Sequence, residues 1–199
     1  TPDIDANASE YTVAQLNNSE VNPKFSGGTL AISGVGELTQ NFSVDAAGGT
    51  IQSDVDVEIS GVLSDDSGAV GSTGDLTKAG TGLLTLSGTN TFSGDIIVGA
   101  GSLVASGSLA GRVVVNNGTS LSGSGTVAGI TNSGTIAPGD SPGTMTSTSD
   151  VVFNSTSVLE QEIDGLAYSL SGGAGSYDRI AVTGAVNTFT AAGSGEVIL

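Results

Sequence analysis

Carboxylates are the side chains of this sequence with the clearest capacity for chemistry. The 199 residues include 20 Asp and Glu but no His and no Cys, which excludes Ser-His-Asp triads, Cys-His dyads and imidazole or thiolate metal sites. Asp65 and Asp66 are adjacent, and two carboxylates about 5–10 Å apart can act as acid and base in polysaccharide cleavage. Neighbouring residues of a strand point to opposite faces, however, and Ser- and Gly-rich surroundings favour a solvated turn. We therefore expect no catalytic residue here and no enzyme.

A second set of carboxylates follows a strand pattern. Within residues 52–60, acidic side chains at positions 54, 56 and 58 alternate with aliphatic side chains at positions 55, 57 and 59. This period of two predicts one strand with a buried aliphatic face and an acidic outer face. Acidic residues at this spacing bind Ca²⁺ only if a neighbouring strand adds oxygens, and no calcium-loop motif is present. We expect a solvated face, with no metal and no cofactor.

Three further motifs favour structural readings. The run Gly123-Ser124-Gly125 lacks the Lys and the helix of a phosphate-binding loop, so we expect a corner. Residues 144–148 contain a Thr-x-Thr row of the kind that ice-binding solenoids use, but it occurs once. The pair Asp178-Arg179 is typical of a surface or strand-to-strand ion pair.

The composition indicates an all-β chain. Net charge is −16 with only 4 Lys and Arg, which excludes a nucleic-acid footprint and a patch for anionic lipid. The 32 Gly separate short runs of Val, Ile, Leu and Thr. Gly, Ser, Thr and Asn are poor helix formers, whereas Thr, Val and Ile favour strands and Gly favours tight turns. No stretch is long and apolar enough to predict a membrane span.

A recurring pattern of Gly, a small or β-branched residue and an aliphatic residue predicts a solenoid. It returns at spacings near 20 residues, with half-steps near 9, as at residues 82–84, 101–103 and 125–127. We expect a right-handed parallel β-helix of about nine short rungs over residues 26–199, with a loop inserted at 64–74. Residues 1–25 are expected to form a cap or extended segment with a short helix near 9–16. An antiparallel β-sandwich is the alternative fold.

The region 75–199 resembles a known family. Residues 76–94, LTKAGTGLLTLSGTNTFSG, closely resemble the autotransporter-associated β-strand repeat of bacterial passenger domains. The runs at 121–127, 134–144, 159–165 and 177–184 are similar to segments that follow this repeat, in the same order. The resemblance implies type V secretion, a right-handed parallel β-helix, and a full-length protein with a C-terminal outer-membrane β-barrel. We expect the sequence to be a fragment of such a protein.

The resemblance implies a secreted, cell-surface passenger segment. We expect a stalk or adhesin whose partner is a surface receptor, a glycan or another passenger copy, and which neither binds nucleic acid nor inserts into membrane. Its C-terminal coils are expected to aid export. The alternative is a polysaccharide-cleaving β-helix enzyme that uses Asp carboxylates.

Overall fold

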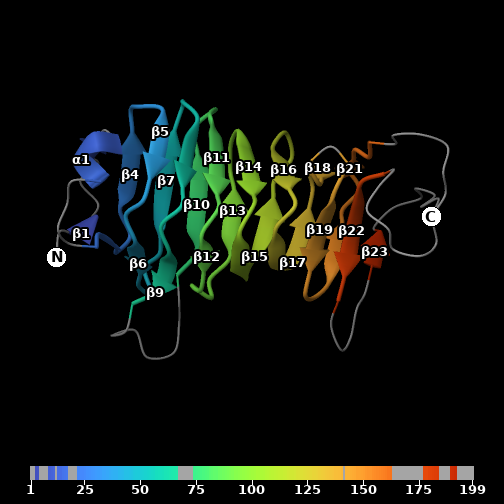
Figure 1. Cartoon of the computed structure of the whole chain (residues 1–199). Helices are drawn as coiled ribbons and strands as arrows, with labels where there is room; N and C mark the ends of the chain where they lie inside the picture. Colours follow the sequence, from blue (N-terminus) through green and yellow to red (C-terminus); the bar gives the residue numbers. More distant parts are fainter. Residues whose placement is uncertain are drawn as a thin grey trace.

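The protein is a three-sided parallel β-solenoid (Figure 1). The computed structural model describes residues 22–66, 74–140, 142–162 and 177–183, and the elements β1 (Asp3–Ile4), β2 (Ser9–Tyr11), α1 (Val13–Asn17) and β23 (Phe189–Ala191). Strands of successive turns stack along one axis, and every pairing between named strands is parallel, so the expected right-handed parallel β-helix is confirmed. Within the described residues, no helix has the length and apolarity needed to cross a membrane.

Two of the three sheets have simple order. The short sheet contains β1, β3 (Lys24–Phe25), β6 (Phe42–Val44) and β9 (Leu63–Asp65). The seven-stranded sheet contains β5 (Gly36–Leu38), β8 (Val57–Ile59), β11 (Leu83–Leu86), β14 (Ser102–Ala105), β16 (Ser120–Gly123), β18 (Thr135–Pro138) and β21 (Val158–Leu159). Each sheet takes one strand from each successive turn, which is the arrangement of a solenoid.

The long sheet covers the third side and bends around a corner. Its path runs through β2, β4 (Thr29–Ile32), β7 (Gly49–Ser53), β10 (Leu76–Ala79), β13 (Ile96–Val98), β15 (Ser108–Val115), β17 (Thr126–Asn132), β19 (Thr144–Ser147) and β22 (Arg179–Val182). Also joined to it are β12 (Thr89–Asn90), β20 (Val151–Phe153) and β23. The first part of β15 pairs with β12 and the last part with β13, so one strand serves two sides of the rod.

The seven-stranded sheet fixes the number of turns. Seven strands are joined by six turns, fewer than the rungs expected. Register partners in this sheet lie from 15 residues apart, for Leu121 and Ile136, to 27 apart, for Val57 and Leu84. The expected rung length near 20 residues is therefore sound. The expected count of about nine rungs differs slightly from these six turns, and the long sheet has one further stacked strand at each end, β2 and β23.

The core is a continuous column of aliphatic side chains inside the three sheets. Strand residues alternate between buried and half-buried, as in β11 and β14, because successive side chains of a strand point to opposite faces. Phe25 and Phe42 add aromatic packing near the N-terminal end, with ring centroids 5.8 Å apart. Each fully buried side chain of this size stabilises the fold by about 1.5–3 kcal/mol.

The single strand expected over residues 52–60 is wrong, because a corner divides it into β7 and β8. The buried Ser53 hydroxyl donates to the carbonyl of Val55 (2.6 Å) and accepts from its amide (3.3 Å), which turns the chain. Val57 and Ile59 are buried as predicted, whereas Val55 is half-buried. The period of two continues through the corner, so it hides the break.

Two other expected boundaries shift. Ser64 and Asp65, expected in the inserted loop, belong to β9 and pair with β6. Residues 67–73 lie outside the described residues, and the 27-residue step confirms extra length in that turn. The expected helix is displaced too: Ser9 lies in β2, and α1 is Val13–Asn17.

Candidate functional site

The outer carboxylates of residues 54–58 bond to the next rung. Each accepts a hydrogen bond from a corner or strand residue 27 or 29 positions further along the chain. The bonded pairs are Asp54 Oδ1 with Thr81 N (2.9 Å) and Oγ1 (3.2 Å), Asp56 Oδ1 with Leu83 N (3.0 Å), and Glu58 Oε1 with Ser87 Oγ (2.5 Å). These side chains were predicted only to be a solvated face. The structure shows that they join one rung to the next. Asp54 and Asp56 accept from backbone amides of the next rung, which would otherwise lack an acceptor there.

Asp65 and Asp66 do not converge on a common point. Asp65 accepts hydrogen bonds from the amide of Ser93 (2.8 Å) and from its hydroxyl (3.1 Å), again on the next rung. Asp66 Oδ2 instead lies 3.8 Å from the ammonium of Lys24, which is also 3.9 Å from Asp45 Oδ2. The pair thus serves two separate structural contacts.

Asp45 is held in its ionised form by the groups around it. Its hydrogen bond with Ser26, assisted by the amide of Ala47 and the charge of Lys24, lowers the pKa of this carboxyl, while burial opposes the shift. In the described part of the chain, no group of three or more potential ligand side chains could hold a metal ion. These carboxylates have the geometry of structural acceptors.

Lys78 is a buried cation that sequence reasoning missed. It stands at an inward position of β10, where its register partners are Ile51 on β7 and Val98 on β13, and its exposed fraction is 1%. Burial lowers the pKa of its ammonium, and the carboxylate of Asp54 partly opposes that shift. The only sequence signal is a basic residue in the buried phase of a strand.

The ammonium of Lys78 reaches a corner, where three backbone carbonyls surround it. It donates to the oxygens of Ala79 (3.0 Å), Gly80 (2.7 Å) and Ala100 (3.1 Å), so all three of its donors have acceptors. Ala79 and Gly80 belong to one rung and Ala100 to the next. We call these three oxygens the Lys78 cage. It ties two successive rungs together.

Asp178 forms a second clasp, at the C-terminal end. Only 7% exposed, its carboxylate accepts from the amide of Gly143 at Oδ1 (2.8 Å) and from the amide of Glu162 at Oδ2 (2.9 Å). Arg179 Nε donates to Thr144 Oγ1 (2.7 Å). The expected Asp178-Arg179 ion pair is wrong: the two residues make separate contacts that hold three chain segments together.

The other two motifs are structural. Gly123 adopts a φ of 109° at the expected corner, and Ser124 donates to Asp140 there (3.0 Å). Thr146 of the Thr-x-Thr row stacks between Thr126 and Ala181, so the row does not continue as threonine on the following strand.

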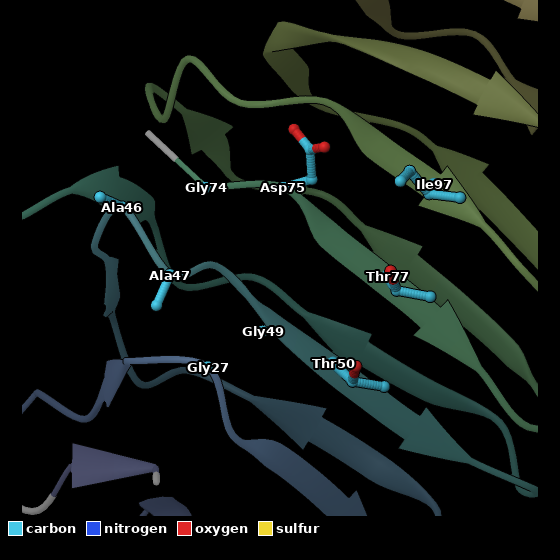
Figure 2. Close-up of a pocket in the computed structure, with 9 residues that line it drawn as sticks. All are labelled: Gly27, Ala46, Ala47, Gly49, Thr50, Gly74, Asp75, Thr77 and Ile97. Carbon is cyan, nitrogen blue, oxygen red and sulfur yellow. The ribbon is translucent and has the colours of Figure 1, made fainter. Parts of the chain in front are cut away.

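An open hollow of about 540 Å³ lies where the long sheet meets the corner that precedes it (Figure 2). Its lining comprises mostly small residues with one isoleucine and one carboxylate: Gly27, Ala46, Ala47, Gly49, Thr50, Gly74, Asp75, Thr77 and Ile97. Asp75 Oδ1 accepts from the amide of Asp95 (3.0 Å). In Figure 2, Thr50, Thr77 and Ile97 extend from neighbouring strands on the same side of the sheet. The hollow holds no constellation of catalytic type.

Comparison with known proteins agrees with this architecture. Residues 76–105, which run from β10 to the end of β14, match the passenger-associated-transport-repeat family. The fold and this match define a β-solenoid with an autotransporter-type passenger repeat. More particularly, the matched residues contain the Lys78 cage, in one full rung that begins at β10 and the first two strands of the next rung. The predicted family resemblance is confirmed for this segment.

Two relatives extend the similarity. An extracellular serine protease of Serratia marcescens is 41% identical over 92 residues, which cover 45% of this chain and 9% of that protein. The adhesin BmaC autotransporter of Brucella suis biovar 1 (strain 1330) is 45% identical over 75 residues, which cover 35% of this chain and 2% of that protein. The matches thus span less than a tenth of either relative. The names of both support the expected secreted or cell-surface localisation.

Proposed function

We propose that this chain is a rod-forming segment of an exported passenger and serves as a stalk or adhesin at the cell surface. The observation that carries the proposal is the uninterrupted stack, in which backbone bonds, outer carboxylates and Lys78 all join one rung to the next. Such a stack is stiff because a continuous core and bonds between rungs hold each rung on its neighbours. The rod holds or supplies a binding face, and its role is non-enzymatic.

Stacking also supplies a reason for folded coils to aid export. A rung that has folded outside the cell resists being drawn back as an extended chain, because withdrawal must break its bonds to the next rung. This proposal rests on the rung-to-rung contacts and on the passenger repeat at residues 76–105.

The test is surface display of the chain fused ahead of an outer-membrane β-barrel anchor. Leu84 and Ile136 are almost fully buried, and their neighbours Thr85 and Ala137 point outward from the same strands. We expect Leu84→Asp and Ile136→Asp to reduce display several-fold, since each buries a charge. The matched outward variants Thr85→Asp and Ala137→Asp should display normally. Equal display of all four variants would refute the proposal.

The non-enzymatic role has its own test. Polysaccharide turnover should be undetectable with neutral and acidic substrates. Activity that disappears in an Asp65→Asn/Asp66→Asn double variant would establish the enzyme alternative instead.

A further inference from the structure

The corner between β15 and β16 carries the one Asn-Gly step of the sequence, Asn117-Gly118. The amide of Thr119 donates to the carbonyl of Asn116 (3.1 Å), which closes a β-turn with Asn117 and Gly118 at its tip. Gly118 has a φ of 81°, a conformation that favours glycine at this position of a turn. Both tip residues are exposed to solvent.

An asparagine followed by a glycine can lose its side-chain amide without an enzyme. The backbone nitrogen of the glycine attacks Cγ of the asparagine. An N–Cγ bond replaces the Cγ–Nδ2 bond, and ammonia leaves with the proton of the glycine amide. Water then opens the cyclic imide. Opening at the side-chain carbonyl gives aspartate, and opening at the backbone carbonyl gives isoaspartate, whose backbone contains one extra CH₂. Glycine favours the attack because it lacks a Cβ and rotates freely.

The tip of this turn leaves the attacking nitrogen accessible. In the described part of the chain, the Gly118 amide donates to no acceptor. A Cβ added to Gly118 would meet no described atom within 4 Å, so no neighbouring rung blocks the approach. The Asn117 side chain forms no hydrogen bond with the described residues either. Attack at Asn117 therefore breaks no bond between rungs.

Other asparagines of the solenoid lack this freedom. The amides of Thr91 and Ser133, which follow Asn90 and Asn132, donate to carbonyls of the preceding rung (2.8 and 2.7 Å). Asn90 and Asn132 are also almost fully buried. Attack at either residue requires its strand to leave the stack. Asn22 precedes a proline, which has no amide proton to give up.

We propose that Asn117 is a site of spontaneous deamidation in the folded solenoid, and that the solenoid tolerates the products. The bonds that hold this corner belong to the flanking residues. The Asn116 amide and the Thr119 hydroxyl both donate to the carbonyl of Val98 (3.3 and 3.2 Å), and the Thr119 carbonyl accepts from Thr135 (3.0 Å). Loop tips without such contacts tolerate changes in the chain.

Deamidation changes the charge of the molecule with time. Each event adds one negative charge to a chain whose net charge is −16. The only co-reactant is water, so the modified fraction grows with the age of the protein. The inference holds whether or not the chain acts as a stalk or adhesin.

Mass spectrometry of peptides from the incubated, purified chain tests the inference. We expect the peptide that contains Asn117 to gain the mass of amide-to-acid exchange, and to do so faster at mildly alkaline than at mildly acidic pH. Unfolding in urea should raise the rate at Asn132 by at least about tenfold but change the rate at Asn117 by less than about threefold, because only Asn132 lies in a strand that must open.

Two neighbouring variants provide a matched control. Asn117→Gln should suppress the reaction at this turn, because glutamine must close a larger ring. Asn116→Gln changes the adjacent exposed residue but keeps the Asn-Gly step, so it should react as the wild type does. The inference is overturned if Asn117 persists in the folded chain while the urea-unfolded chain loses it, or if Asn117 and Asn132 react equally fast in the folded chain.

Tolerance of the products has a separate readout. Anion-exchange chromatography separates the modified chain by its extra charge. Its midpoint of urea unfolding should equal that of the unmodified chain, because the bonds of Asn116 and Thr119 remain in place. A clearly lower midpoint would show that the corner does not tolerate the change and would overturn that part of the inference.

Discussion

Lys78 shows how one charged residue can occupy a core position of the solenoid. Its backbone sits between Ile51 and Val98 in the stack, but its long side chain carries the ammonium out to the Lys78 cage. Charged groups in protein interiors are tolerated when every donor is satisfied. The bond to Ala100 exists only when the following rung is in place. Lys78 therefore couples the folding of two rungs.

This burial predicts a pH dependence of stability. The pKa of Lys78 lies below its ordinary value of 10.5 in the folded chain, because burial disfavours the ammonium more than Asp54 favours it. Between the lowered and the ordinary value, the unfolded chain binds a proton that the folded chain does not, so the free energy of unfolding rises with pH. We expect the wild type to gain stability relative to Lys78→Met between neutral pH and 10.5. Urea unfolding across this range measures the difference, and a gap that narrows or stays constant would contradict it.

Asp178 allows a test of how much the number of hydrogen-bonded carboxylate oxygens matters for stability. Each of its two oxygens accepts one backbone amide, whereas only one oxygen of Asp56 accepts an amide bond, from Leu83. An Asn side chain keeps one acceptor but turns an NH₂ toward the second position. We expect Asp178→Asn to lower the free energy of unfolding by about 1–3 kcal/mol, because it leaves a buried donor unpaired. Asp56→Asn should change it by less than about 0.5 kcal/mol. Similar losses in both variants would show that charge, and not the paired amides, matters.

At the scale of the element, corners determine the shape of the solenoid. Strands of two to eight residues are separated by tight turns, where chains from successive rungs pass very close to each other. Gly80 has a φ of 79°, and a Cβ there would lie 2.3 Å from the carbonyl oxygen of Ser53. Gly118 has a φ of 81°, but a Cβ there would meet nothing within 4 Å.

This pair of glycines separates backbone strain from steric clash. Gly118→Ala should lower the free energy of unfolding by about 1–2 kcal/mol, because a residue with a Cβ is strained in the left-handed conformation. Gly80→Ala should cost more than about 3 kcal/mol, because the corner must also move away from the next rung. Thermal unfolding monitored by circular dichroism compares the two. Equal losses would mean that the corners yield easily.

The sequence predicted the strands better than the corners. Alternation identified the buried positions of β8 and β11 because burial follows the period of two. The resemblance of residues 76–94 to a known repeat supported the same strands. Alternation could not reveal the corner at Ser53, since the phase is preserved through it. Alternation also placed Asp54 on the outside, but it could not predict that Thr81 is its partner. Such partners depend on the length of each rung, which the sequence pattern does not give. Lys78 carried the wrong polarity for its phase, which was the overlooked signal.

At the scale of the whole molecule, the rungs act as interchangeable layers. Leu103 pairs with Leu84 on one side and with Leu121 on the other, 18 residues later. Deletion of residues 103–120 therefore removes one complete turn and places Leu121 on Leu84. Stability in such stacks is close to a sum over rungs and their interfaces, so the loss should be modest.

We expect the chain lacking residues 103–120 to unfold cooperatively with an unchanged β-type circular dichroism spectrum. The control lacks residues 103–111, which is half a turn. This control places Arg112 in the inward position that Leu103 occupied, and a slip of this kind turns inward side chains outward. It should fold poorly. Comparable stability of both deletions would show that the register is not specified by the inward pattern.

The unequal rung lengths have a mechanical consequence. Because backbone bonds between rungs run along the rod axis, a pull on its two ends loads the interfaces in series, and the rungs detach one after another. A freed rung of 15 to 27 residues, the range between register partners, lengthens the chain by roughly 50–95 Å at about 3.5 Å per residue. Stretched between two surfaces, the rod would lengthen in unequal steps as rungs detach. The length of each step would identify the rung that had opened.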